Sequence, residues 1–172
     1  MSSAPQMTLS DYPSSVQNVA AVLLERGHDQ LPRMLDDAAR TAQQAADGLG
    51  VALGQIAKSI IFKRKPDGVH VLVITAGDKR VDEKKVAALV CADSQSLGRA
   101  DADFVRERTG YAIGGVPPLA HAQKGLTLID ESLQRFELVW AAAGHPHSVF
   151  ALRPEALPAL TGAAFADVAQ AA

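Results

Sequence analysis

The sequence lacks the features that would staple a fold covalently or anchor it in a membrane. Its 172 residues include one cysteine, Cys91, so no internal disulfide can form and no thiolate cluster can hold zinc. No apolar run approaches the roughly 20 residues that cross a bilayer, and the polar first 17 residues do not have the pattern of a signal peptide. We therefore expect a cytoplasmic protein with no cofactor and no membrane partner.

The chain also lacks an excess of either charge. It has 17 Lys and Arg residues against 19 Asp and Glu residues, which gives a net charge of −2. Proteins that coat DNA or a membrane through bulk charge are strongly basic, so this balance predicts no DNA partner and only local contact with any nucleic acid. Hydrophobic residues make up 48% of the chain, which is typical of a globular protein that buries one core.

Residue patterning predicts one domain at residues 14–172 after a loose lead-in at residues 1–13. The β-branched runs IAKSIIFKR and VHVLVIT flank the turn sequence KPDG, which predicts a central hairpin. Further strands are expected at residues 30–35, 126–129, 136–141 and 148–152. Helices are expected at residues 14–27, with Ser14 or Ser15 as the cap, and at 36–48, with Gly48 or Gly50 as its end. Further helices are expected at 81–90, at 100–108 and from 154 onward. Because these elements do not alternate as βαβ units, we expect an α/β fold around a mixed sheet or barrel.

Positive charge is concentrated in residues 58–85, which we call the basic segment. It holds eight Lys and Arg residues against four Asp and Glu residues, a local net charge of +4. The candidate contacts with nucleic-acid phosphates in it are Lys63, Arg64, Lys65, Lys79 and Arg80. A solvated hairpin end followed by a solvated helix face would give the same pattern, so both interpretations stay open.

Lys58 differs from the other cations of the basic segment because it lies between Ile56 and Ile60, at the start of an apolar run. A lysine in such a place either reaches out to water or takes part in chemistry. Gly114 and Gly115 precede the sequence VPP, so the backbone there can adopt conformations closed to other residues and can expose peptide groups to a ligand. An ordinary edge-strand lysine and an ordinary turn are the alternatives.

His145 and His147 are two residues apart, a spacing that places both side chains on one face of an extended segment and that metal sites use. The sequence offers them no evident third ligand. Patterns of the HExxH, GxSxG, P-loop and dinucleotide-binding types do not occur in the chain. We therefore expect no metal site, and a metal-dependent hydrolase built on these histidines is an alternative without a ligand set.

Five sequence blocks occur together in one order along the chain. They are QIAKSIIFK at 55–63, VLVITAGDKRVDEKKVA at 71–87, TGYAIGGVPPLAH at 109–121, LIDESL at 128–133 and AAAGHP at 141–146. With them the chain resembles the YbaK/prolyl-tRNA synthetase-associated editing domains, free-standing aminoacyl-tRNA deacylases, over roughly residues 15–165. The resemblance implies a compact domain in which helices surround a mixed sheet closed into a barrel-like core. It also implies metal-free hydrolysis of the ester that joins a wrong amino acid to a tRNA, usually tRNA(Pro), with prolyl-tRNA synthetase as an associated partner.

The resemblance also implies roles for individual residues. Lys58 matches the lysine that holds the terminal phosphate and adenosine of the acceptor end, and Gly114 and Gly115 match the glycine pair whose backbone lines the aminoacyl pocket. Gly144 with His145 matches the turn on the other side of that pocket. This set contains a fixed cation for a phosphate and exposed peptide groups for an oxyanion, but no catalytic triad. Water would then be the nucleophile, and positioning of the ester and stabilisation of the oxyanion would promote its attack.

The residue after the lysine departs from the pattern of family members selective for alanine. Those members have asparagine there, whereas this chain has Ser59. Ser59 and His145 are therefore candidates for admitting another small side chain, such as that of Ser, Thr, Cys or a non-protein amino acid. The alternative function is a non-catalytic tRNA-binding or synthetase-associated adaptor with the same fold, and the presence of Lys58, Gly114 and Gly115 favours the enzyme.

Overall fold

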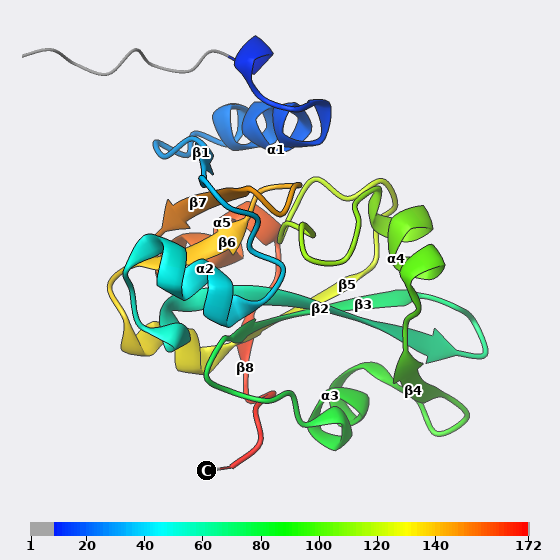
Figure 1. The fold of residues 1–172 in the computed structure, drawn as a ribbon. Coiled ribbons are helices and arrows are strands. Elements are labelled where there is room, and N and C mark those ends of the chain that lie inside the picture. The colour runs from blue at the N-terminus through cyan, green and yellow to red at the C-terminus, as the bar shows by residue number, and fades with distance from the viewer. Residues whose placement is uncertain (1–8, 172) are drawn as a thin grey trace, which may run out of the picture.

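The computed structural model describes residues 9–171, in which helices and strands follow one another in a mixed order (Figure 1). The helices are α1 (Ser14–Glu25), α2 (Ala42–Leu49), α3 (Glu83–Val90), α4 (Ala102–Thr109) and α5 (Leu157–Thr161). The strands are β1 (Arg33–Met34), β2 (Ile56–Lys65), β3 (His70–Ala76), β4 (Ser96–Arg99), β5 (Leu126–Asp130), β6 (Val139–Ala142), β7 (Ser148–Leu152) and β8 (Phe165–Ala166). Short 3-10 helices lie at Leu9–Asp11, Leu53–Gln55, Glu131–Arg135 and Pro154–Ala156. Across residues 9–171, no helix combines the length and the apolar character that a membrane span requires.

All eight strands belong to one mixed sheet. Seven of them lie in the order β1-β7-β6-β2-β3-β5-β8, and β4 pairs with β2 beside this path. Strand β2 is antiparallel to β3 and β4 and parallel to β6. These pairings confirm the predicted mixed α/β domain. No ladder among the described strands joins β1 to β8, so closure of the sheet into a barrel stays a prediction.

The β2–β3 hairpin confirms the strongest local prediction of the sequence. Its register pairs seven residues of each strand, from Ala57 with Ala76 to Lys63 with His70. Gly68 in the turn takes the left-handed conformation, with φ 73°, which glycine adopts without a steric penalty. In Figure 1 the hairpin crosses the molecule, with α2 near the start of β2 and α4 near its far end.

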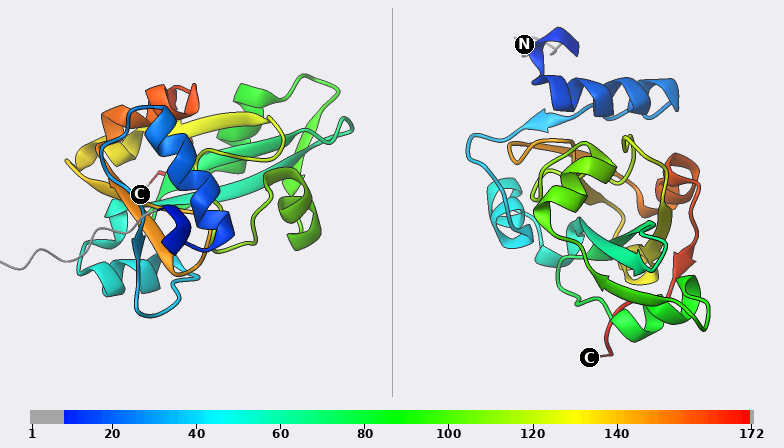
Figure 2. Two further views of the ribbon diagram at one scale, coloured as in Figure 1. Left: turned by 90° about the horizontal axis from the view of Figure 1, so that it is seen from above. Right: turned by 90° about the vertical axis from the view of Figure 1, so that its right-hand side faces the viewer.

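The two faces of the hairpin belong to two hydrophobic clusters, because side chains alternate across a strand. Ile61 and Ile74 pack in the larger cluster, together with residues of α1, α5 and the loop that follows α4. Phe62 and Val73 pack on the opposite face with Val86 of α3 and with the C-terminal segment. Figure 2 shows α1 and α3 on opposite sides of the sheet, as this division requires. The sheet is therefore buried on both faces along most of the hairpin.

The predicted start of the second helix at residue 36 is wrong, because the capping residue lies further along the chain. Thr41 Oγ1 accepts a hydrogen bond from the N–H of Gln44 at 3.1 Å, and the Gln44 side chain accepts one from the N–H of Thr41 at 3.3 Å. This reciprocal pair fixes the start of α2 at Ala42. The helix ends at Gly50, as expected, in the left-handed conformation with φ 69°.

The other predicted elements are confirmed with small shifts at their ends, and two strands were missed. The predicted edge strand is the two-residue β1, and the later strands are β5, β6 and β7. The short strands β4 and β8 were not predicted. The cap of α1 is Pro13, without a side-chain hydrogen bond, and neither predicted serine fills that role. Of the predicted lead-in, residues 1–8 lie outside the described residues; Tyr12 is buried and its hydroxyl donates to Pro32 O at 2.7 Å.

Candidate functional site

Among residues 9–171, no strand pairs with the middle of one edge of β2. The first two residues of β2 pair with β6 and its last four with β4, so within this part of the chain residues 58–61 have β3 as their one strand partner. The N–H of Arg64 donates to Val69 O across the hairpin at 2.8 Å. Peptide groups alternate in direction along an antiparallel strand, so Ser59 and Ile61 direct theirs to the open edge. A ligand at this edge can therefore meet backbone groups as well as side chains.

A cavity of about 580 Å³, which we call the larger cavity, opens at this edge of β2. Three cations line it, Lys58, Arg80 and Arg99, against one carboxylate, that of Glu83. Apolar side chains of β2, of α4 and of the loop around Gly114 form the remaining walls. The excess of positive charge over apolar walls suits a ligand that combines a phosphate with an apolar ring.

Lys58 projects from the open stretch of β2 and is half-buried, directly opposite Thr75 in the hairpin register. Burial lowers the pKa of the Lys58 ammonium below its ordinary value of 10.5, and Arg80 lowers it further, while Asp78 and Asp130 act in the opposite direction. Lys58 takes part in none of the ion pairs within residues 9–171. A partly desolvated and unpaired ammonium binds an anion more strongly than one at an open surface.

A buried carboxylate supports the strand opposite Lys58. Asp130 Oδ2 accepts hydrogen bonds from Thr75 Oγ1 at 3.0 Å and from the N–H of Ala76 at 3.1 Å. Its other oxygen accepts from the N–H of Ser132 at 2.9 Å. This network joins the end of β3 to β5 and fixes Thr75 behind Lys58. The carboxylate also adds a negative charge that favours the charged form of the lysine.

A second cavity of about 250 Å³, the smaller cavity, adjoins the first and shares Lys58, Ser59 and Gly114 with it. Its walls are mostly apolar and come from α2, β2 and β6. Two buried polar atoms on its lining residues, Ser59 Oγ and Trp140 Nε1, have no hydrogen-bond partner within residues 9–171. Buried polar groups are nearly always paired in folded proteins, so these two atoms are exceptions; their side chains leave β2 and β6 on opposite faces of the sheet.

The loop with the two glycines closes over both cavities. Gly114 lines both and has φ 97°, a conformation that other residues rarely adopt. At Gly115 a Cβ would lie 2.9 Å from His145 N, so the loop packs against backbone there. The N–H of Gly115 donates to Ala112 O at 3.0 Å, whereas that of Gly114 has no acceptor within the described part of the chain. Gly114 is thus the member of the pair that can offer a peptide N–H to a ligand.

Gly144 and His145 lie beside this loop but are not among the residues that line either cavity. At Gly144, with φ 101°, a Cβ would lie 2.6 Å from Ser15 O, so α1 packs closely there. His145 Nδ1 accepts a hydrogen bond from the N–H of His147 at 3.0 Å, which tightens the turn. No group of three His, Cys, Asp or Glu residues is placed to hold a metal ion in residues 9–171. His145 therefore supports the glycine loop through its backbone and its own turn through Nδ1, and it lines neither cavity.

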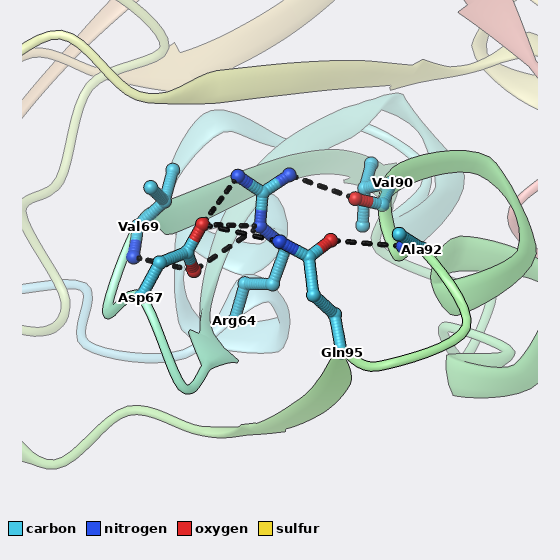
Figure 3. A network of polar contacts seen from close by, with 6 residues as sticks. All are labelled: Arg64, Asp67, Val69, Val90, Ala92 and Gln95. Atoms are coloured by element: carbon cyan, nitrogen blue, oxygen red, sulfur yellow. Dashed lines mark hydrogen bonds and ion pairs between the residues drawn. The ribbon is translucent and has the colours of Figure 1, made fainter.

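Arg64 of the basic segment is held in a network of polar contacts (Figure 3). Its guanidinium forms an ion pair with Asp67 at 2.7 Å and donates to Val90 O at 2.8 Å. Gln95 also donates to Asp67, at 3.3 Å. These bonds tie the hairpin turn to the end of α3 and to the loop before β4. The guanidinium of Arg64 is thus already engaged.

The other predicted tRNA contacts are distributed over different surfaces. Arg80 lines the larger cavity, and Lys79 precedes it in the turn after β3, where its N–H donates to Ala76 O at 2.9 Å. Lys63 lies on the hairpin face opposite Arg64, and Lys65 extends along β4 beside Gly98. Of the five candidates, the structure therefore brings Arg80 into the cavity that contains Lys58.

Sequence reasoning did not single out three residues of the two cavities. Arg99 comes from β4, a strand that was not predicted, and Ile113 is exposed at the tip of the glycine loop. Trp140 is the one tryptophan of the chain, and it lies within a strand that was predicted. Of these three residues, Trp140 alone could have been noticed in the sequence, as a lone tryptophan in a predicted strand. Arg99 and Ile113 carry no such signal, because tertiary folding brings them to the cavities.

Comparison with known proteins identifies the family. The family described as the aminoacyl-tRNA editing domain matches residues 36–160, which is more than two thirds of the chain. The chain belongs to this family. The match confirms the resemblance seen in the sequence, and it spans Lys58, both glycines of the loop and every residue that lines the two cavities except Gln170.

Individual relatives agree with this assignment. The protein YwhH of Bacillus subtilis is 38% identical over 117 residues, which cover 68% of this chain and 72% of YwhH. The multifunctional Ser/Thr-tRNA deacylase ProXp-y of Escherichia coli is 32% identical over 131 residues, which cover 74% of this chain and 77% of ProXp-y. A crystal structure of a candidate trans-editing enzyme for prolyl-tRNA synthetase superposes with a TM-score of 0.84 at 37% identity and covers 93% of this chain and 99% of that one.

Proposed function

We propose that this chain hydrolyses the ester bond of mischarged tRNA in trans, and that its substrate is tRNA(Pro) carrying a small non-cognate amino acid. The observation that carries the proposal is the pair of adjoining cavities with Lys58 on both. The larger, cationic cavity suits the terminal nucleotide, and the smaller, mostly apolar one suits a short amino-acid side chain. The names of ProXp-y and of the candidate trans-editing enzyme support the reaction and the association with prolyl-tRNA synthetase.

The residues of the two cavities are sufficient for a positioning mechanism. The Lys58 ammonium, with Arg80 and Arg99, binds phosphate of the acceptor end and brings the ester to the shared wall of the cavities. Water attacks the ester carbonyl carbon, and the peptide N–H of Gly114 donates to the oxyanion that forms. The bond from the carbonyl carbon to the ribose oxygen then breaks, and that oxygen takes a proton. The products are the free amino acid and intact tRNA.

Ser59 favours one class of amino acid over another. Its Oγ has no hydrogen-bond partner within residues 9–171, and a hydroxyl or thiol placed beside Ser59 in the smaller cavity can pair with it, whereas the apolar ring of proline cannot. Serine, threonine and cysteine should therefore be removed fastest, alanine more slowly and proline slowest. This order agrees with the presence of Ser59 where members selective for alanine have asparagine.

A deacylation panel tests the proposal. One tRNA(Pro) is charged separately with Pro, Ala, Ser, Thr or Cys, and the rate of ester loss is measured at saturating protein against a reaction without protein. At least one of Ser, Thr and Cys should be released well above background, with Pro close to background. Background rates for all five esters, with a folded protein that still binds the tRNA, would contradict the proposal and favour the adaptor.

A further inference from the structure

Two cations and an aromatic ring meet on the hairpin face opposite the Arg64 network, and no step of the proposed reaction uses them. Lys63 Nζ lies 5.2 Å and the Arg108 guanidinium carbon 5.0 Å from the centroid of the Phe104 ring on α4. Both side chains also approach the hairpin turn: a Cβ on Gly68 would lie 4.0 Å from Lys63 Cε and 3.7 Å from Arg108 Nη2. We call Lys63, Phe104 and Arg108 the Phe104 cluster.

The cations of the Phe104 cluster are not neutralised by neighbouring acids. Neither Lys63 nor Arg108 takes part in an ion pair within residues 9–171. Asp67, in the same turn, is bound to Arg64. Asp101, at the start of α4, accepts a hydrogen bond from the N–H of Phe104 at 2.8 Å and so caps the helix. Two like charges held together without a counterion attract an anion.

Arg108 also has an unused donor. Its Nε is buried and has no hydrogen-bond acceptor in the part of the chain that the structure describes. Protein atoms enclose this nitrogen, so a phosphate meets the terminal nitrogens of the planar guanidinium, whose geometry suits it. Arg108 further contributes, after burial and His121, to lowering the pKa of His70. His70 therefore stays mostly neutral at pH 7, and the charge that meets a ligand is that of Lys63 and Arg108.

The Phe104 cluster lies along β2 from Lys58. Lys63 lies five positions after Lys58 on β2, and at a rise of about 3.3 Å per residue these five steps span about 17 Å along the strand. Because five is an odd number, the two side chains leave β2 on opposite faces. The wall of the larger cavity includes Val105, the residue after Phe104 on α4, although none of the three cluster residues lines it. A strand with the axial rise of duplex DNA, about 3.4 Å per nucleotide, covers 17 Å in about five nucleotides, and a more extended single strand covers it in fewer.

We propose that the Phe104 cluster is a second phosphate-binding site, which holds the backbone of the tRNA acceptor end within about five nucleotides of the terminal adenosine. The proposal rests on the function proposed above, and it adds a surface on α4 that fixes the direction in which the acceptor end leaves the larger cavity. Lys63 and Arg108 bind the phosphate, and Phe104 holds the two side chains in place through its ring face.

Attachment of α4 to the hairpin is the competing role for these residues. If cation–π contacts served stability alone, removing Arg108 would lower the melting temperature and slow every substrate by the same factor. A phosphate site instead predicts an effect that depends on substrate length. A substrate too short to reach the Phe104 cluster should not respond to the loss of Arg108.

The experiment compares Lys63→Ala and Arg108→Ala with wild type on two substrates, full-length seryl-tRNA(Pro) and a seryl-CCA trinucleotide. Arg106→Ala is the matched control, because Arg106 is exposed on α4 and two residues from Arg108, on the other side of the helix. Each cluster variant should lose about tenfold in kcat/KM on the tRNA. The slope of log kcat/KM against log salt concentration should become shallower by about one, and the rate on the trinucleotide should not change. Thermal unfolding of every variant serves as the folding control.

Two results would overturn the second phosphate site: equal losses on both substrates, or wild-type kcat/KM for Arg108→Ala on the tRNA. If the wild-type protein hydrolyses neither ester, the proposed function fails, and the second phosphate site is then tested by binding of uncharged acceptor-stem RNA. Wild-type affinity of Arg108→Ala for this RNA would also overturn the second phosphate site. Weaker binding of this variant, with normal binding by Arg106→Ala, would support it.

Discussion

Removal of the Lys58 ammonium should abolish most of the activity and leave the fold intact. The side chain is half-buried, takes part in no ion pair within residues 9–171 and lines both cavities. A hydrogen bond from such a group to phosphate lies at the upper end of the range for charged partners, about 3 kcal/mol. Loss of that amount in the transition state corresponds to about 10²-fold in kcat/KM for Lys58→Ala.

The assay is single-turnover deacylation of seryl-tRNA(Pro) at saturating protein, with circular dichroism as the folding control. Lys84→Ala is a matched control, because Lys84 belongs to the same basic segment and is exposed on α3. We expect Lys84→Ala to retain the wild-type rate. The loss for Lys58→Ala should appear in the rate constant as well as in affinity, because a misplaced ester is poorly aligned for attack by water.

The pH dependence offers an independent check on Lys58. Burial and Arg80 hold the pKa of its ammonium below 10.5, so catalysis that needs the charged form should fall as pH rises towards this lowered pKa. Lys58→Arg keeps a charge at all these pH values and should remove the alkaline decline. Its rate should recover in part, because a planar guanidinium does not reproduce the geometry of a compact ammonium. Uncatalysed ester loss at each pH is subtracted.

A folded Lys58→Ala protein that deacylates at the wild-type rate would refute this reasoning. The phosphate would then be held without Lys58, and the larger cavity would lose the contact that joins it to the reacting ester. A loss of rate that Lys84→Ala shares would contradict it as well, since the effect would then belong to the overall charge of the basic segment and not to one placed ammonium.

Three further predictions concern the glycine loop, the smaller cavity and the buried histidines. Gly115→Ala should cost about 1–3 kcal/mol of stability and slow deacylation, because its Cβ would lie 2.9 Å from the backbone of His145; wild-type activity and urea midpoint would contradict the close contact. Ser59→Ala should raise the melting temperature by about 2–4 °C, because it removes a buried unpaired hydroxyl that destabilises the fold by about 1 kcal/mol. It should also slow the release of serine more than that of alanine, and a lower melting temperature would show that the hydroxyl is paired. Burial lowers the pKa values of His70 and His121 below 6.5, so near and below that pH the unfolded chain binds more protons than the folded one. Stability should therefore fall as pH drops from 6.5 towards these lowered values, and equal urea midpoints at pH 7.5 and 5.5 would contradict this.

The parts of the fold that the sequence predicts are those with strong local signals. The KPDG turn between two β-branched runs specifies the hairpin, and glycines past the helical patterns specify the ends of α1 and α2. The start of α2 was misplaced because a run rich in alanine carries helical propensity on both sides of the Thr41 cap. The short strands β4 and β8 owe their existence to pairing with distant segments, which local propensity does not encode.

The candidate site divides in the same way. Lys58 and Gly114 stand out in the sequence, the first by an apolar surrounding and the second by a glycine pair, and the fold brings them onto shared walls. The unpaired state of Trp140 Nε1 and the approach of Arg108 to Lys63 depend on tertiary packing. A basic segment in the sequence also does not reveal that Arg64 is engaged by Asp67 whereas its neighbour Lys63 is not.

The most direct test of trans-editing is the steady-state level of mischarged tRNA in a reconstituted reaction. Prolyl-tRNA synthetase, tRNA(Pro) and a non-cognate amino acid that the synthetase activates are combined with and without this protein, and the acylated tRNA is measured over time. The account predicts that the protein suppresses accumulation of the mischarged product and leaves prolyl-tRNA(Pro) at its normal level. Equal accumulation of mischarged tRNA with and without the folded protein, for each of serine, threonine, cysteine and alanine that the synthetase attaches, would contradict it.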